Sequence, residues 1–159
     1  PLSQAVFPHI SRLAGQSQQA ALAFAGKVAK VMGSVMLLMS IALLIGAPYV
    51  ARLALGEQFQ SGVPVIRILA LVPFITAFSN VFGAQVMVNF GLKKLLARIL
   101  IAAGILNVIV ALLLVMPLKH EGVALASLTT EIFVTAAMFL ALRRKELHVF
   151  GAWRWNRPV

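Results

Sequence analysis

Long uncharged stretches alternate with short polar ones along this chain. Residues 31–51, 68–92 and 99–118 carry no charge, and residues 122–142 carry one, Glu131. Each stretch is 20 to 25 residues long, and about 20 apolar residues in a helix cross the hydrocarbon core of a bilayer. Strands of a membrane barrel would alternate apolar and polar residues instead. The pattern predicts an all-α, polytopic membrane protein with four transmembrane helices.

The stretch before the first predicted span differs in character. Pro8 is expected to interrupt a helix, and residues 15–19 are polar without charge. Residues 20–30 are apolar, with two lysines on one flank. We therefore expect residues 1–30 to hold the end of a preceding membrane helix and then a cytoplasmic amphipathic elbow. This elbow would lie along the membrane and lead into the first span.

These boundaries leave a four-helix transmembrane part at residues 31–147 and a basic aromatic cytoplasmic tail at 148–159. In the tail, residues 152–157 alternate aromatic and basic side chains. That order suits an interfacial anchor on an anionic leaflet and equally suits a disordered end. The chain begins at Pro1 rather than Met, in a sequence typical of the end of a helix. This start predicts the C-terminal part of a longer protein.

The basic residues predict the orientation in the membrane. An even number of spans places both ends of the chain on one side, and that side carries eleven of the 14 Lys and Arg residues. They are Arg12, Lys27, Lys30, Lys93, Lys94, Arg98, Arg143, Arg144, Lys145, Arg154 and Arg157. The opposite side carries Arg52, Arg67 and Lys119. Because cytoplasmic loops are rich in Lys and Arg, the termini are expected in the cytoplasm.

Composition narrows the function classes. Hydrophobic residues make up 61% of the chain and charged residues 11%, with a formal net charge of +10. The positive charge does not indicate nucleic-acid binding, because the basic residues are separated by apolar spans instead of gathering on one folded face. The absence of Cys excludes a disulfide framework and a thiolate metal site. The three histidines are far apart, so we expect no catalytic residues, no metal and no cofactor.

Glu131 stands near the middle of the fourth predicted span. A carboxylate at the centre of a transmembrane helix costs about 2.5–3.5 kcal/mol on insertion scales. Such a residue faces other protein or a water-filled cavity, which points to transport. The alternative is a buried hydrogen bond to neighbouring Ser, Thr or Asn side chains.

Other polar residues follow helical faces within the spans, because positions i and i+4 share a face. Ser127, Glu131 and Thr135 form one face of the fourth span, and Asn107 lies among small residues in the third. The second span has two polar faces. The predicted substrate and ion pathway comprises Glu131, Asn80, Gln85, Asn89, Asn107, Ser127 and Thr135.

Each of these residues also has a simpler interpretation. Small and amide residues promote close helix packing and interhelical hydrogen bonds of about 0.6–2 kcal/mol. The first span holds only Ser34 and Ser40 with glycines, so it is predicted to face lipid. Pro48, Pro73 and Pro117 either kink helices or mark their ends.

Several segments together resemble the Wzx-type polysaccharide flippases, which belong to the superfamily of the multidrug and toxin extrusion transporters. Residues 1–13 resemble the end of the eighth helix of that family. Residues 79–85 are similar to its tenth helix, with the basic loop at 91–94 after them. Residues 122–131 resemble the start of the twelfth, including the acidic residue, and Asn107 falls where asparagine is common in the eleventh. The resemblance extends to about Leu147.

This resemblance implies helices nine to twelve of a twelve-helix flippase, with two six-helix lobes and alternating access. Such proteins move oligosaccharide repeat units linked to undecaprenyl pyrophosphate across the bacterial inner membrane, for O-antigen or exopolysaccharide synthesis. The implied partners are this lipid-linked oligosaccharide, membrane lipids, the remaining N-terminal helices of the same chain and the polysaccharide polymerase machinery. A cationic lumen would come from the other helices, because these spans contain no Arg or Lys.

Two other functions remain open from the sequence. A multidrug or cation antiporter of the same superfamily would use the buried carboxylate to take up a proton or sodium ion. A membrane interaction module without transport activity would use its polar residues only to bind a partner. Intramembrane Arg or Lys in additional upstream spans would favour the flippase, and intramembrane Asp there would favour the antiporter.

Overall fold

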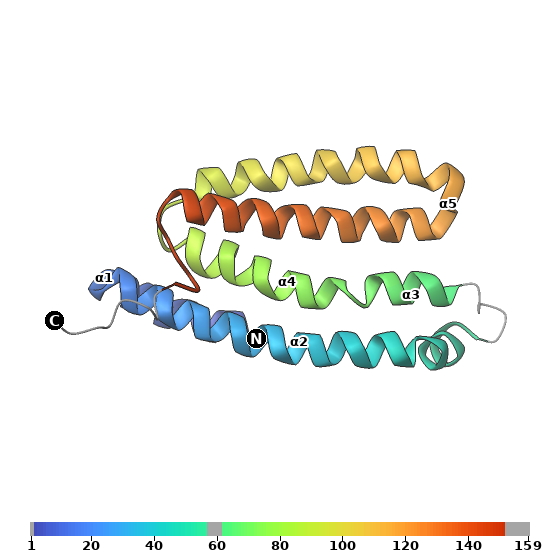
Figure 1. Ribbon diagram of the computed structural model, residues 1–159, viewed down its shortest axis with the longest axis horizontal. Helices are drawn as coiled ribbons and strands as arrows, with labels where there is room; N and C mark the ends of the chain where they lie inside the picture. Colours follow the sequence, from blue (N-terminus) through green and yellow to red (C-terminus); the bar gives the residue numbers. More distant parts are fainter. Residues whose placement is uncertain (1, 57–61, 152–159) are drawn as a thin grey trace.

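The computed structural model describes residues 2–56 and 62–151, and every regular element in these residues is helical. The elements are α1 (Leu2–Gln16), α2 (Gln18–Leu55), α3 (Val63–Leu69), α4 (Val72–Asn80), the π-helix η2 (Val81–Met87) and α5 (Lys93–Arg144). They lie lengthwise beside one another in an elongated bundle (Figure 1). The expected all-α class is confirmed.

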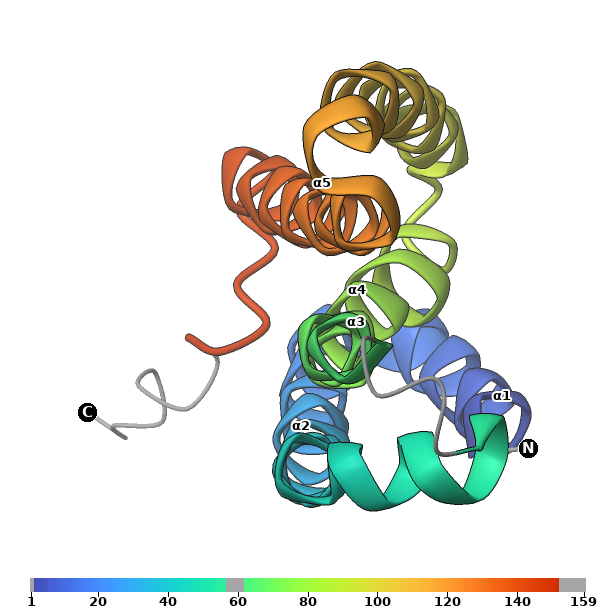
Figure 2. The same ribbon diagram turned by 90° about the vertical axis from the view of Figure 1, so that its right-hand side faces the viewer.

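Within the residues that the structure describes, three helical segments are long and apolar enough to cross a membrane: Gln18–Leu53, Val63–Met87 and Lys93–Arg144. The last has 52 residues, so a straight helix of that length would measure about 78 Å, more than twice the hydrocarbon core. The backbone of Lys119 leaves the helical region, with φ 47° and ψ −119°, and the chain reverses there. Figures 1 and 2 show the two halves of α5 side by side. Apart from α1, the described residues therefore form four rods: α2, the second rod (α3, α4 and η2) and the two halves of α5. The two halves of α5 match the predicted third and fourth spans.

The turn of α5 depends on a glycine just after the reversal. A Cβ added to Gly122 would meet the backbone carbonyl of Leu114, so the two halves approach more closely than any other residue permits. Pro117 lies two residues before Lys119 and ends the first half, since its ring disfavours continued helix. Pro48 instead lies inside α2, and Figure 2 shows the last turns of α2 bent away from the rest of the helix.

The second rod is assembled from three short elements. α3 ends at Leu69, α4 begins after Leu71 with Pro73 in its first turn, and η2 continues directly from α4. This rod starts at Val63 and ends at Met87, so the predicted limits of 68 and 92 were wrong. The predicted start was too late because Arg67, which is exposed, lies within α3. The predicted end was also too late, because residues 88–92 form a turn in which the Leu92 amide donates to the Met87 carbonyl at 2.8 Å.

The N-terminal prediction was wrong in two respects. α1 continues through Pro8, whose side chain is exposed. The chain breaks at Ser17, which has an extended backbone (φ −156°, ψ 119°) and accepts a hydrogen bond from the Ala20 amide at 3.4 Å. A serine N-cap of this kind starts a new helix. From Gln18 onward the expected elbow and the first span form one uninterrupted helix, α2.

α5 ends in a Schellman motif. The Leu147 amide donates to the Leu142 carbonyl and the Glu146 amide to the Arg143 carbonyl, each at 3.0 Å, with Glu146 in the left-handed region at φ 58°. Residues 147–151, here named the C-terminal strap, then cross toward α2 and η2. Leu147 and Val149 are buried. The first residues of the predicted tail thus pack on the bundle, and the alternating 152–157 segment lies outside the described residues.

The bundle gathers the expected cytoplasmic charges at one end. The start of α2 and both ends of α5 lie together at the left of Figure 1. Lys93, Lys94, Arg143 and Arg144 occupy the two ends of α5. The reversal at Lys119 lies at the opposite end, with the start of α3. The basic residues at the two ends of α5 therefore lie at one end of the bundle.

The close approach in α5 generates the first prediction. Gly122→Ala places a methyl group against the Leu114 backbone and should destabilise the folded protein by about 1–3 kcal/mol. Gly104 has nothing within 4 Å of an added Cβ, so Gly104→Ala should be neutral or slightly stabilising. Unfolding by SDS in mixed micelles compares the two variants. Equal stability of both would contradict the tight turn.

Candidate substrate and ion pathway

Glu131 lies in the second half of α5, beside an open groove of about 320 Å³. The groove runs between the second rod, the start of α5 and the second half of α5. The residues that line it are Thr76, Ser79, Asn80, Gly83, Ala84, Val88, Leu96, Leu100, Glu131, Val134 and Met138. Two of the predicted pathway residues, Asn80 and Glu131, are therefore brought together from different rods.

The groove concentrates oxygen atoms around one ionisable group. Glu131 is the only ionisable residue among those that line it. Within the described residues, Oε2 of Glu131 and Oγ1 of Thr76 are both buried and make no hydrogen bond. Ser79 Oγ donates to the Thr76 carbonyl at 3.2 Å. Carboxylate and hydroxyl oxygens attract protons and hard cations, and a buried carboxylate gains from such a partner because isolated charge is costly in an apolar medium.

Gly83 shapes the floor of this groove. It belongs to the π-helix η2, and an added Cβ would lie 3.1 Å from the Met138 Cε atom. The lack of a side chain therefore lets the second half of α5, which carries Glu131, approach the second rod. Single π-turns inside helices are frequent at functional sites.

The other residues of the Glu131 face are separated from the groove. Thr135 Oγ1 donates to the Ile75 carbonyl at 3.5 Å and lines a different cavity. Ser127 Oγ donates to the Val123 carbonyl of its own helix at 3.1 Å. The face still points at the second rod through Glu131 and Thr135. Two grooves share it because each step of four residues rotates about 40° around a helix.

Gln85 and Asn89 do not join the Glu131 groove. Gln85 is buried within η2, only 2% exposed. The side-chain Nδ2 of Asn89 donates to the backbone carbonyl of Gln85 at 2.7 Å. Asn89 thereby supplies a donor to the backbone where the π-helix ends, so its geometry matches a structural role.

Asn107 links the two halves of α5. Its Nδ2 atom donates to Thr130 Oγ1 at 3.0 Å, and Thr130 Oγ1 donates to the Ala126 carbonyl at 2.7 Å. This is the packing interpretation of Asn107, which places it outside the groove. Thr130 precedes Glu131 directly, so the same hydrogen bond holds the helix segment that positions the carboxylate.

Exposed apolar side chains are not confined to the first predicted span, whose contact with lipid stays a prediction. Large apolar side chains of α2 are exposed, among them Val31, Leu38 and Ile45. The first half of α5 is equally exposed at Ile101 and Leu112. Of the three membrane-length segments, the second rod is the most buried. The second rod is thus both the most buried of the three and rich in polar side chains, among them Thr76, Asn80 and Gln85.

Thr76, Ser79, Gly83 and Thr130 are candidate site or support residues that the predicted pathway omitted. Thr76 lies four residues before Asn80 and Gly83 three after it, so helical spacing already places them on one of the two polar faces predicted for the second span. Ser79 and Thr130 bond to backbone carbonyls three and four residues earlier, and nothing in the sequence separates this local use from a role in the groove.

Comparison with known proteins finds relatives of this chain by sequence. The chain is 32% identical over 149 residues to a protein of Escherichia coli (strain K12) described as "Putative O-antigen transporter", covering 94% of this chain and 36% of that protein. It is 24% identical over 143 residues to a protein of Shigella dysenteriae with the same description. The chain is a homologue of these O-antigen transporters. The resemblance drawn from the sequence motifs is confirmed.

The homologous region has a defined extent. The chain spans about a third of the length of these two O-antigen transporters while matching over nearly all of its own residues. No protein-family profile matches the chain, and no solved structure matches it. The homology covers all four rods, the Glu131 groove included.

The hydrogen bond between the halves of α5 generates the second prediction. Asn107→Leu and Thr130→Val each remove one partner, and the double variant should reveal a coupling of about 0.6–2 kcal/mol. Ser127 bonds only within its own helix, so Asn107→Leu and Ser127→Ala should be additive. Unfolding of the single and double variants in detergent micelles measures both cycles. A coupling no larger in the first cycle than in the second would refute the interhelical bond.

Proposed function

We propose that this chain is the C-terminal part of a flippase in the bacterial inner membrane. Its substrate would be an oligosaccharide repeat unit linked to undecaprenyl pyrophosphate, moved outward by alternating access for O-antigen or exopolysaccharide synthesis. The observation that carries this proposal is the homology to O-antigen transporters over 94% of the chain. The Glu131 groove, built from three parts of the bundle, supports it with a polar feature that transport requires.

The charge of the groove suggests how its residues divide the work. A pyrophosphate is repelled by a carboxylate, so the substrate headgroup is not expected to contact Glu131. Glu131 instead suits a proton or cation whose binding changes the charge at the interface between the second rod and α5. Such a charge change favours one packing of the two rods over another, and it can drive a lobe between inward-facing and outward-facing states.

The relatives, and not the groove, favour a flippase over an antiporter. Both would use a buried carboxylate, so the groove alone is compatible with either. The descriptions of the two relatives favour the flippase. A transport protein of this kind needs no catalytic residues, and the proposal assigns none.

The proposed topology has four spans, formed by α2, the second rod and the two halves of α5, with the termini in the cytoplasm. The gathering of basic residues at one end of the bundle supports it.

The third prediction uses the absence of cysteine from the chain. Lys94→Cys should react with impermeant maleimide only after the cytoplasmic side is opened, and Arg67→Cys should react in intact cells with a permeabilised outer membrane. Labelling of Lys94→Cys from the periplasm would reverse the orientation.

The fourth prediction concerns the ionisable group of the groove. Glu131→Gln keeps the size and hydrogen-bonding capacity of the side chain while removing its negative charge. The variant should reach the membrane at normal levels and yet restore surface polysaccharide at least tenfold less than the parent in a flippase-deficient strain, an effect of about 1.4 kcal/mol or more on the coupled step.

The matched control is Glu121→Gln, the same substitution at the turn of α5, which should complement fully. Immunoblotting of membranes reports accumulation, and gel analysis of the surface polysaccharide reports transport. Full complementation by Glu131→Gln would assign the residue to packing alone.

A further inference from the structure

The C-terminal strap joins three rods at the end of the bundle where the basic residues gather. It follows the last turn of α5 directly. The ring of Phe150 lies 6.5 Å from that of Phe78 and 5.9 Å from that of Phe82, both on the second rod. The backbone carbonyl of Val149 lies against Gly26 of α2. Residues 147–151 thus connect α5 to α2 across the second rod.

The two ends of the strap are held in different ways. Leu147 belongs to the Schellman motif of α5, in which its amide donates to the Leu142 carbonyl at 3.0 Å. Beyond Leu147, the described part of the strap makes one hydrogen bond, from the Gly151 amide to the His148 carbonyl at 3.3 Å, and this bond is internal. Residues 148–151 are therefore held on α2 and the second rod by apolar contacts, while Leu147 is fixed to α5.

Gly26 forms the seat of the strap on α2. It is buried, and a Cβ added there would collide with the Val149 carbonyl oxygen. Glycine is the residue that lets the two backbones approach this closely. The Val149 side chain is 5% exposed, whereas its neighbours His148 and Phe150 are exposed. Val149 is therefore the residue whose burial depends on the strap being seated.

Opposing contributions meet at Val149. Burial of its apolar side chain stabilises the seated strap. Among the described residues, however, neither its amide nor its carbonyl has a hydrogen-bond partner, although nearly all buried backbone groups in proteins have one. Both groups would gain bonds to water if the strap left its seat. The unpaired groups therefore lower the free energy needed to release the strap.

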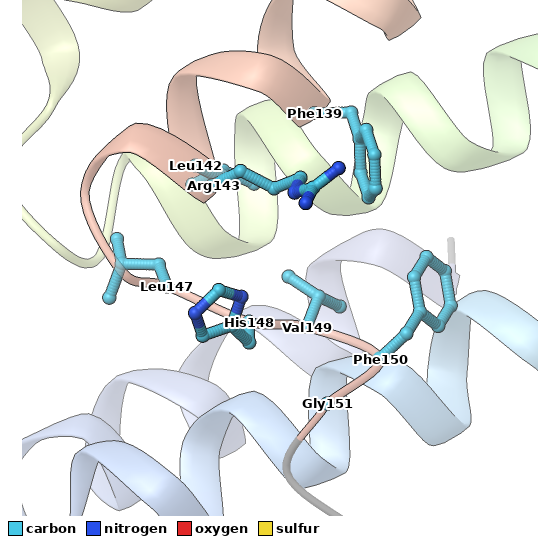
Figure 3. Close-up of a pocket in the computed structure, with 8 residues that line it drawn as sticks. All are labelled: Phe139, Leu142, Arg143, Leu147, His148, Val149, Phe150 and Gly151. Atoms are coloured by element: carbon cyan, nitrogen blue, oxygen red, sulfur yellow. The ribbon is translucent and has the colours of Figure 1, made fainter.

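A cavity lies between the strap and α5. Its volume is about 110 Å³, and Figure 3 shows Phe139 and Arg143 of α5 on one side and the strap on the other. Well-packed protein interiors seldom leave voids larger than a water molecule. Arg143 and His148, which both line the cavity, are exposed. The strap is therefore loosely packed on the α5 side and firmly seated only at Gly26.

We propose that the C-terminal strap is a clasp that opens and closes. In the closed state, which the structure shows, residues 148–151 tie α5 to α2. In the open state they turn away about Leu147, which stays on α5, and Val149 leaves Gly26. Separation of α2 from the end of α5 requires the open state, because the closed strap bridges the two. The use of this separation in transport rests on the proposed function, whereas the clasp itself does not.

Thiol labelling tests the clasp, because this chain contains no Cys. The protein as its gene encodes it, with any cysteine outside this chain replaced by serine, is reconstituted in nanodiscs and treated with a water-soluble maleimide. His148→Cys, at an exposed position, reports the reactivity of an accessible thiol in the strap. If the strap is open in about 0.1–10% of molecules, Val149→Cys should react to completion about ten- to a thousandfold more slowly.

A methyl group at the seat should hold the clasp open. In a Gly26→Ala background, labelling of Val149→Cys should rise to within about threefold of that of His148→Cys. The matched control is Gly46→Ala in the same helix, where nothing lies within 4 Å of an added Cβ. It should leave the rate within about twofold of the parent. Ala47→Cys, fully buried in α2, should stay unlabelled in the Gly26→Ala background, which shows that the bundle remains folded.

Phe150→Ala opens the clasp by a different change. It removes the ring contacts with the second rod from a side chain that is 43% exposed, so it should speed labelling of Val149→Cys at least about threefold without unfolding the bundle. This variant decides the question if Gly26→Ala exposes Ala47→Cys.

Three results would overturn the proposal. Labelling of Val149→Cys only after SDS unfolds the protein would make the strap a permanent strut. Labelling of Val149→Cys as fast as His148→Cys in the parent would show that the strap is not seated on α2. Equal acceleration by Gly26→Ala and Gly46→Ala would show that Gly26 is not the seat.

Discussion

Every other part of this bundle packs against the second rod. α2 lies along one side of it, α5 along another, and α1 contacts it at η2. In a membrane, lipid chains are as apolar as leucine, so helices associate through close packing and interhelical hydrogen bonds. Glycines permit that packing here: an added Cβ at Gly33 of α2 would lie 2.7 Å from the Phe78 Cζ atom. The position of the Glu131 groove follows from this central rod.

The second rod is also the least regular part of the bundle. It is interrupted between α3 and α4, and it widens into a π-helix from Val81 to Met87. Backbone groups released by such irregularities must find partners inside the protein, because lipid offers none. The Asn89 side chain meets one of these demands at the Gln85 carbonyl. Hinges lie at a few loop or element-terminal residues, so the breaks in this rod are candidate hinges for the lobe movement proposed for transport.

The second rod presents different side chains on two of its faces. Thr76, Asn80 and Gly83 line the groove of Glu131, while Phe74 and Phe78 line cavities against α2 and the second half of α5. Spacing of three or four residues within each set keeps its members on one side.

The sequence by itself determined the class of the protein, because the free energy of placing 20 uncharged residues in lipid depends on composition more than on neighbours. It also determined the prominence of Glu131, since a charge among apolar residues needs no partner to be recognised. The two ends of α5 and its reversal near Lys119 were also predictable, because charged residues there interrupt the uncharged runs.

Tertiary structure decided what depends on partners far apart in sequence. The helix breaks at Ser17 and not at Pro8. No break separates the predicted elbow from the first span, so both belong to α2. The second rod begins earlier than predicted because Arg67 belongs to α3 while its charge remains exposed. Asn107 donates a hydrogen bond to the Thr130 hydroxyl, and Thr135 donates one to the Ile75 carbonyl. Helical spacing assigns a polar residue to a face, but only the packing of a second helix decides whether that face is a groove, a hydrogen bond or the lipid surface.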